Sequence, residues 1–129
     1  MISLNFFVSD CEKAIEFYKK GMGAEISHTN LPEEGDYRSA KFSINGHLFA
    51  IAQASEKFGT KTPNMLGGVP MCIQLFVPDV KGFMDRAIEH GASLGMPSTT
   101  EKPIVLSPKG DEFANIVDPD GYYWSIIKG

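Results

Sequence analysis

The chain has 129 residues, of which 43% are hydrophobic and 22% are charged, and its formal net charge at pH 7 is −4. A chain of this length suits one compact domain with an ordinary hydrophobic core. The acidic balance and the scattered Lys and Arg residues disfavour nucleic acid and anionic membranes as partners, and no apolar run is long enough to span a bilayer. The N-terminus lacks the pattern of a signal peptide, and Cys11 and Cys72 are expected to be free thiols, so we predict a cytoplasmic protein.

The opening residues alternate as a strand does, with one apolar face made by Ile2, Leu4, Phe6 and Val8. A helix is predicted next, because apolar residues recur at helical spacing from Cys11 to Tyr18. Ser9 and Glu12 fit a capping box at its start, and Gly21 stands where a helix-ending glycine is expected.

Two strands follow, joined by the two-residue turn Asn45-Gly46, at 36–44 and 47–54. The sequence from 55 to 69 contains several glycines and prolines and no clear periodicity. We therefore predict that this segment connects two halves of the chain.

The second half repeats the first. The segment IQLFVPD matches LNFFVSD, and a second helical stripe follows, capped by Asp79 and ended near Gly91. Residues 95–110 predict a strand and a loop whose bounds the sequence leaves open. The half closes with two strands joined by a turn of sequence DPDG, at 112–118 and 122–128.

The chain therefore divides into a first module (1–54), a connector (55–69) and a second module (70–129), each module having the order βαβββ. Two such modules ending in DPDGYYWSI resemble the vicinal oxygen chelate superfamily, which includes glyoxalase I, extradiol dioxygenases, fosfomycin resistance enzymes and bleomycin resistance proteins. Within it, CEKAIEFYKKGMGAE, SINGHLFAIA and GDEFANIVDPDGYYWSI are most similar to the PhnB-like branch. The resemblance implies an α+β fold in which two tandem modules form curved mixed sheets around a cleft.

Metal-dependent members of this superfamily hold a divalent ion between the modules, with His or Glu at four strand positions. The corresponding positions of this sequence are Ser3, Ala50, Cys72 and Ser125. One thiol and two hydroxyls supply neither the charge nor the number of ligands that Mn²⁺, Fe²⁺, Ni²⁺ or Zn²⁺ needs. We therefore expect no metal ion and no other cofactor.

Alternation along the strands predicts which side chains face the cleft. Pairing across the Asn-Gly turn brings Tyr37 and Lys41 to this face, and Glu112, Ala114 and Ile116 take the corresponding places in the second half. The predicted surface is apolar with a few polar groups, which is typical of a small-molecule pocket. The candidate ligand-binding residues are Asn5, Phe7, Tyr37, Lys41, Cys72, Gln74, Phe76, Glu112, Tyr123 and Ser125.

We favour a metal-independent protein that binds an apolar or aromatic ligand in the cleft, as bleomycin resistance proteins do. The alternative is an enzyme of the same superfamily, lyase or dioxygenase-like, acting on a small oxygenated metabolite. Without a metal ion, its acid or base would be Tyr37, Lys41 or Glu112, whereas the four strand positions argue against a metal-dependent lyase or dioxygenase. In a third interpretation, the aromatic side chains of the candidate set close on each other and fill the cleft.

Two further expectations concern the core and the assembly. Trp124 is predicted in the core, on the helix-facing side of the last strand, and Cys72 is predicted to be a small buried side chain rather than a nucleophile. A module of about 60 residues buries too little surface alone and leaves an open sheet edge. Because members of the superfamily commonly pair, we expect a symmetric homodimer.

Overall fold

The computed structural model describes residues 2–34 and 37–129. Its first half consists of β1 (Leu4–Val8), α1 (Cys11–Met22), β2 (Glu25–Asn30), β3 (Ser39–Ile44) and β4 (His47–Gln53). These strands form one sheet, called sheet A here, in the order β1-β4-β3-β2. Strand β1 runs parallel to β4, and the other neighbours are antiparallel.

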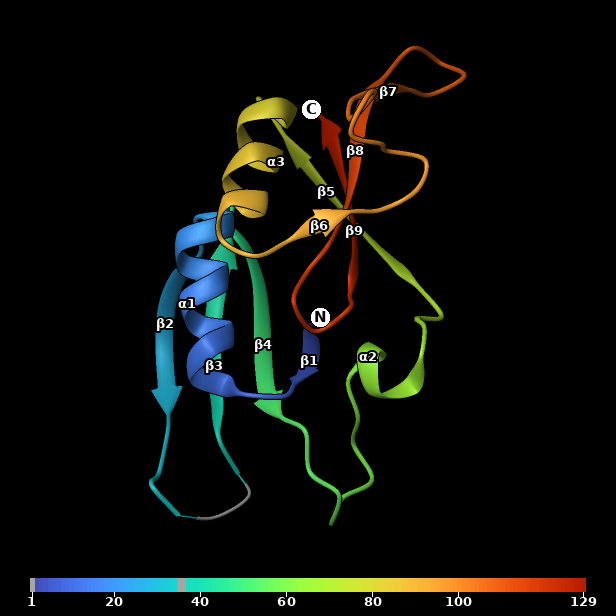
Figure 1. The fold of residues 1–129 in the computed structure, drawn as a ribbon. Coiled ribbons are helices and arrows are strands. Elements are labelled where there is room, and N and C mark those ends of the chain that lie inside the picture. The colour runs from blue at the N-terminus through green and yellow to red at the C-terminus, as the bar shows by residue number, and fades with distance from the viewer. Residues whose placement is uncertain (1, 35–36) are drawn as a thin grey trace.

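The second half follows a short connector helix, and the elements from that helix onward are α2 (Pro63–Leu66), β5 (Cys72–Val77), α3 (Val80–Glu89), β6 (Ser93–Leu94), β7 (Val105–Leu106), β8 (Glu112–Val117) and β9 (Tyr123–Lys128). The second sheet, sheet B, has the order β5-β9-β8-β6, with β7 also paired to β8. Because β5 runs parallel to β9 as β1 does to β4, the predicted pair of mixed βαβββ sheets is confirmed. Figure 1 shows sheet A behind α1 and sheet B beside α3.

Both long helices have an aspartate as the N-cap residue. The side chain of Asp79 caps α3, as predicted. The predicted cap of α1 is wrong by one residue, because Asp10 rather than Ser9 accepts the hydrogen bond from the N–H of Lys13. Ser9 instead donates its own N–H to the carboxylate of Asp120, which lies in the second module.

The end of α1 also differs from its prediction. Gly21 lies inside the helix, and a Cβ there would come within 3.2 Å of the Phe17 ring and 3.3 Å of His90. This glycine therefore permits close packing of α1 rather than ending it. The helix ends at Gly23, whose φ of 69° favours glycine.

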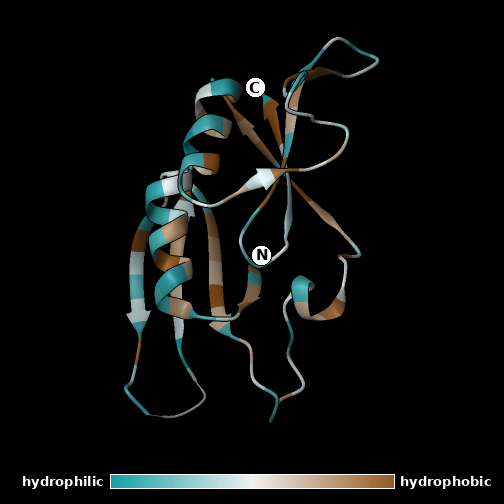
Figure 2. Ribbon diagram, in the orientation of Figure 1, coloured by the Kyte–Doolittle hydropathy of each residue, from teal (hydrophilic) through white to brown (hydrophobic). Residues whose placement is uncertain are grey.

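One core is shared by the two modules. Trp124 of β9 is fully buried, and its ring centroid lies 5.7 Å from those of Phe6 and Phe49 in sheet A and 6.1 Å from that of Tyr18 in α1. The prediction that Trp124 belongs to the core is confirmed. Helix α1 packs against α3, and both helices alternate polar and apolar residues along their length (Figure 2), as helices with one buried side do.

Each module covers the free edge of the other module's sheet. The hydroxyl of Tyr122, in the turn before β9, accepts a hydrogen bond from the N–H of Phe7 at 3.0 Å and donates one to the carbonyl of Phe7 at 2.8 Å. Phe7 lies in β1, the edge strand of sheet A. In return, Asn45, in the turn between β3 and β4, donates its Nδ2 to the carbonyl of Phe76 in β5, the edge strand of sheet B. The turn of each module thus contacts the edge strand of the other module's sheet.

A buried carboxylate holds the second of these turns in place. Asp118 is only 4% exposed, and its Oδ2 accepts hydrogen bonds from the hydroxyl of Tyr18 at 2.5 Å and from Nε1 of Trp124 at 2.9 Å. Its Oδ1 accepts the backbone N–H groups of Asp120 and Tyr122. Burial raises the pKa of Asp118, while the bonds from Tyr18 and Trp124 act in the opposite direction. Asp118 therefore ties the turn to α1 and to β9.

The connector docks on the same turn. Asn64 of α2 donates its Nδ2 to the carbonyl of Pro119 at 2.9 Å, and its N–H bonds the carbonyl of Asp120. Gly121 has a φ of 99°, and a Cβ there would lie 2.4 Å from Oδ1 of Asn64. Glycine is required here both for its backbone conformation and for this close approach.

Across the residues that the structure describes, none of the helices has the length and apolar character needed to cross a membrane.

Candidate functional site

The face of sheet B that points away from the core carries three rows of side chains across its strands. Gln74 of β5, Ser125 of β9 and Asn115 of β8 lie side by side in the middle row. The next row is apolar and consists of Phe76, Ile127 and Phe113, and the third consists of Cys72, Tyr123 and Val117. Five predicted site residues therefore share one surface.

A pocket of about 480 Å³ covers the first two of these rows. We call it the sheet B pocket, and its lining residues are Gln74, Phe76, Ser107, Pro108, Lys109, Asp111, Phe113, Ser125 and Ile127. The loop after β7 and the strands β5, β8 and β9 supply these residues. The volume is within the range of ordinary small-molecule sites.

The chemistry of the sheet B pocket is apolar with polar groups at its margin. Phe76 is 55% exposed, so its ring is available for contact rather than packed into the core. This exposure contradicts the interpretation in which Phe76 fills the cleft itself. Asn115, next to Ser125, has a buried Oδ1 that accepts no hydrogen bond from the described residues. Because this oxygen is enclosed, it is not available to a ligand in the sheet B pocket.

The prediction that Cys72 is buried is wrong, because the residue stands at the start of β5 and is exposed. Partial burial of its thiol still raises the pKa of Cys72, against a lowering effect of a backbone hydrogen bond from Ser125. A smaller fraction of its thiol is therefore ionised at neutral pH than in an ordinary cysteine, which argues against a nucleophilic role.

Other predicted site residues lie on the outer face of sheet A. Asn5 of β1, Ala50 of β4 and Lys41 of β3 form one row, in the register expected from the Asn-Gly turn. Phe7 lies on the same face and is half-buried. Tyr37 precedes β3 rather than belonging to it, and its side chain is 65% exposed.

The predicted position of Glu112 is wrong. The register pairs Asn115 with Ser125 and Phe113 with Ile127, so Ala114 and Ile116 point into the core and Glu112 shares their side of β8. The reason is the turn, because five residues separate Val117 from its partner Tyr123, whereas two separate the paired ends of β3 and β4. An odd loop length exchanges the two faces of the incoming strand.

The chain does not bring these two outer faces together. The buried faces of both sheets meet at Trp124, so the outer faces point away from that core and from one another. The sheet B pocket is accordingly lined by residues of the second module alone. A cleft shared between the modules of one chain was expected, and the described residues instead form two separate surfaces.

The residues at the superfamily's metal positions do not fit a metal ion. Ala50 has no donor atom, and Ser3 and Ala50 belong to the sheet A side while Cys72 and Ser125 belong to the outer face of sheet B. Within the described parts of the chain, no group of three or more His, Cys, Asp or Glu side chains is placed to hold a metal.

Sequence reasoning missed the loop that walls the sheet B pocket. Ser107, Lys109 and Asp111 gave no periodic signal, and only the nearby proline and glycine indicated a loop. Phe113 was missed because the register of β8 depends on the length of a turn whose conformation the sequence does not reveal. The sequence shows that Phe113 and Ala114 point to opposite faces of the strand, but it does not show which of these two residues points into the core.

This chain is similar to known proteins both in sequence and in fold. A model of the Glyoxalase/Bleomycin resistance protein/Dioxygenase superfamily matches residues 2–126. An uncharacterized protein of Mycobacterium bovis is 32% identical over 129 residues, covering 97% of this chain and 80% of the relative. A glyoxalase-related enzyme from Fulvimarina pelagi superposes with a TM-score of 0.71 at 20% identity, covering 100% of this chain and 87% of that one. A superfamily member from Sphaerobacter thermophilus superposes with a TM-score of 0.70 at 23% identity, covering 98% and 94%.

Proposed function

The chain belongs to the glyoxalase/bleomycin resistance protein/dioxygenase superfamily, and on this premise we propose that it is a metal-independent binding protein for a flat apolar or aromatic molecule. The observation that carries the proposal is the half-exposed ring of Phe76 in the sheet B pocket, beside Phe113 and Ile127. An aromatic ring held at a pocket wall contacts a planar ligand at little cost in ordering. The analogy with the superfamily's bleomycin resistance proteins, which hold a drug in an aromatic cleft, supports a binding protein of this kind.

The polar margin of the pocket favours a ligand that carries at least one polar group. Gln74 and Ser125 supply donors and acceptors, and Lys109 and Asp111 supply one charge of each sign. A ring bearing a hydroxyl or amide group therefore matches the pocket better than a pure hydrocarbon does.

The test is thermal denaturation of the protein across a library of aromatic metabolites and antibiotics, followed by titration of any ligand that raises the Tm. Phe76→Ala should weaken binding by roughly 1 to 3 kcal/mol, as loss of an aromatic contact does. Phe58→Ala, which removes a similarly exposed ring in the connector, is the matched control and should leave the Kd unchanged. A parent protein that no ligand stabilises, or an equal Kd in Phe76→Ala, would contradict the proposal.

We also propose a symmetric homodimer, supported by the outer faces of the two sheets. The row of Asn5, Ala50 and Lys41 lies open on sheet A, next to Leu48, which is 62% exposed. A second chain related by a two-fold axis can cover such a face on both copies at once. Light scattering should give twice the mass of the chain, and a monomer at micromolar concentration would contradict the dimer.

A cytoplasmic location is the remaining part of the proposal. The cysteines, Cys11 and Cys72, are unpaired, which a reducing compartment preserves. Cell fractionation of the tagged protein is the direct measurement.

A further inference from the structure

A second cavity lies on the helix side of the molecule, between α1 and the turn that precedes β9. Its volume is about 280 Å³, and it shares no lining residue with the sheet B pocket. From its charge and shape we infer that it binds a small organic cation, an ammonium group on a short apolar body. This site goes beyond the proposed function and stands independently of it.

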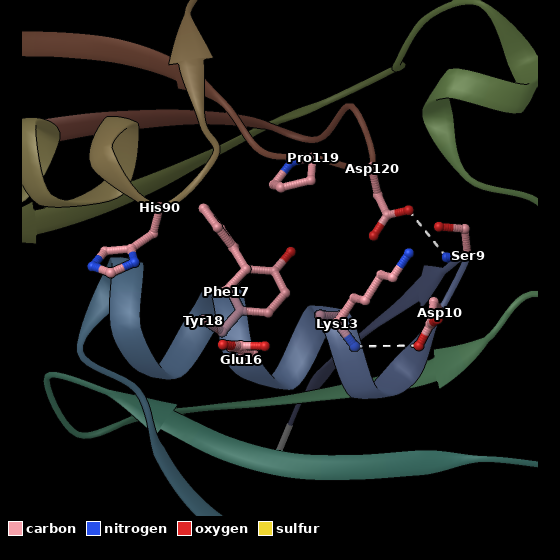
Figure 3. A pocket seen from close by; sticks show the side chains of 10 residues that line it. Ser9, Asp10, Lys13, Glu16, Phe17, Tyr18, His90, Pro119 and Asp120 are labelled. Carbon is pink, nitrogen blue, oxygen red and sulfur yellow. Dashed lines mark hydrogen bonds between the residues drawn. The ribbon is translucent and has the colours of Figure 1, made fainter.

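The first observation is the carboxylate of Asp120, which is only 8% exposed. Its Oδ1 accepts the N–H of Ser9 at 3.0 Å, and its Oδ2 receives no hydrogen bond from the rest of the described chain. Figure 3 shows that this second oxygen points into the cavity, toward the space between Tyr18 and Lys13. This oxygen remains open to solvent, so a donor from a bound molecule can reach it and form a charge-assisted hydrogen bond.

The second observation is the balance of charge around the cavity. Carboxylates of Asp10, Glu16 and Asp120 line it, whereas its basic side chains are Lys13 and His90. The amine of Lys13 forms no ion pair with a described residue, and in Figure 3 it extends toward the carboxylate of Asp120. Glu16 is paired outside the cavity with Lys20 at 2.7 Å. The excess of carboxylates favours a cation over an anion or a neutral molecule.

The third observation is the apolar part of the lining. Ala14, Phe17 and Pro119 form the apolar part of the lining, and Figure 3 shows Phe17 and Pro119 on the side of the cavity away from Ser9 and Asp10. An apolar body of one ring fits this volume, and aromatic rings attract cations at their faces. The site therefore selects an ammonium group that is attached to a compact hydrophobic group, rather than a hydrated metal ion.

The test is an NMR titration of the full chain with benzylammonium, with benzyl alcohol and benzoate as matched neutral and anionic probes. We expect benzylammonium to shift the backbone amides of 9–18 and 118–121 and to bind about tenfold more tightly than benzyl alcohol, because one charged contact is partly shielded from water. Benzoate should not bind at this site. Absence of saturable benzylammonium binding, an equal affinity for benzyl alcohol, or shifts centred on the sheet B pocket would overturn the inference.

Two variants sharpen the test. Asp120→Asn keeps an acceptor for the N–H of Ser9 and should abolish the preference for the cation, whereas Asp111→Asn in the sheet B pocket should leave it unchanged. Lys13→Gln removes the competing amine and should tighten benzylammonium binding several-fold. A preference that persists in folded Asp120→Asn, or an unchanged affinity in Lys13→Gln, would refute the site even if the sheet B pocket binds its own ligand.

Discussion

Replacing Tyr122 by Phe removes one hydroxyl and keeps the ring. That hydroxyl makes two hydrogen bonds to the backbone of Phe7, at 3.0 and 2.8 Å, across the junction of the two modules. The ring also packs against Phe6, with centroids 5.1 Å apart, and a Phe side chain preserves this contact. Tyr122→Phe therefore isolates the contribution of the hydroxyl to the free energy of unfolding.

The magnitude follows from the number of bonds and their burial. Each hydrogen bond contributes about 1 kcal/mol net, and a backbone group left without a partner costs more when it is buried. Phe7 is half-buried, so water can replace part of the loss. We expect Tyr122→Phe to lower the free energy of unfolding by about 2 kcal/mol, which corresponds to a Tm lower by roughly 6 °C for a chain of this size.

The assay is urea unfolding followed by the fluorescence of Trp124, the single tryptophan of the sequence, which is fully buried when folded. Parent and variants must be compared at one protein concentration, because dimerisation adds to apparent stability. Tyr123→Phe is the matched control, since no hydrogen bond joins the hydroxyl of Tyr123 to a described residue, and its cost should stay below about 0.5 kcal/mol. If the two variants lose equally little stability, Tyr122 does not secure the edge of sheet A and the reasoning is refuted.

Three other measurements test the structure. Asp118→Asn places an amide donor against the donors of Tyr18 and Trp124 and should cost roughly 2 to 3 kcal/mol in the same assay, so a loss under about 1 kcal/mol would contradict the hydrogen-bond network. Burial raises the pKa of Cys11 to about 11, so a thiol reagent at neutral pH should modify Cys72 first and reach Cys11 only on unfolding; equal rates for the two thiols would show that Cys11 is accessible. Elemental analysis of the purified protein should find substoichiometric metal, and one tightly held divalent ion per chain would show that the reasoning about the four strand positions is wrong.

Local patterns in the sequence were sufficient for the modules but not for their arrangement. The Asn45-Gly46 turn fixes the register of its hairpin, because a two-residue loop with positive φ at both positions has one geometry, and Lys41 indeed pairs with Ala50. The DPDG turn is longer and is shaped by the buried Asp118, so its loop length could not be counted from the sequence and Glu112 was placed on the wrong face.

The candidate site shows the same limit. Alternation identified Gln74, Phe76 and Ser125 as neighbours on one face, because a strand allows only two faces. It could not say whether the faces of two modules point toward each other, since that depends on how large side chains such as Trp124 pack between them. The position of the loop 107–111 could not be predicted for a related reason, because it depends on how the loop packs against the face of sheet B.

The exchange of edge contacts makes the two modules depend on each other for folding. Tyr122 closes β1, and Asn45 makes the reciprocal contact with β5, so each repeat is completed by the other. A single repeat on its own would expose an unpaired strand edge and half a core, and two copies of it could cover both by a two-fold arrangement. In the chain, each module supplies the other with part of its core and with hydrogen bonds to its edge strand, so we expect neither half to fold on its own.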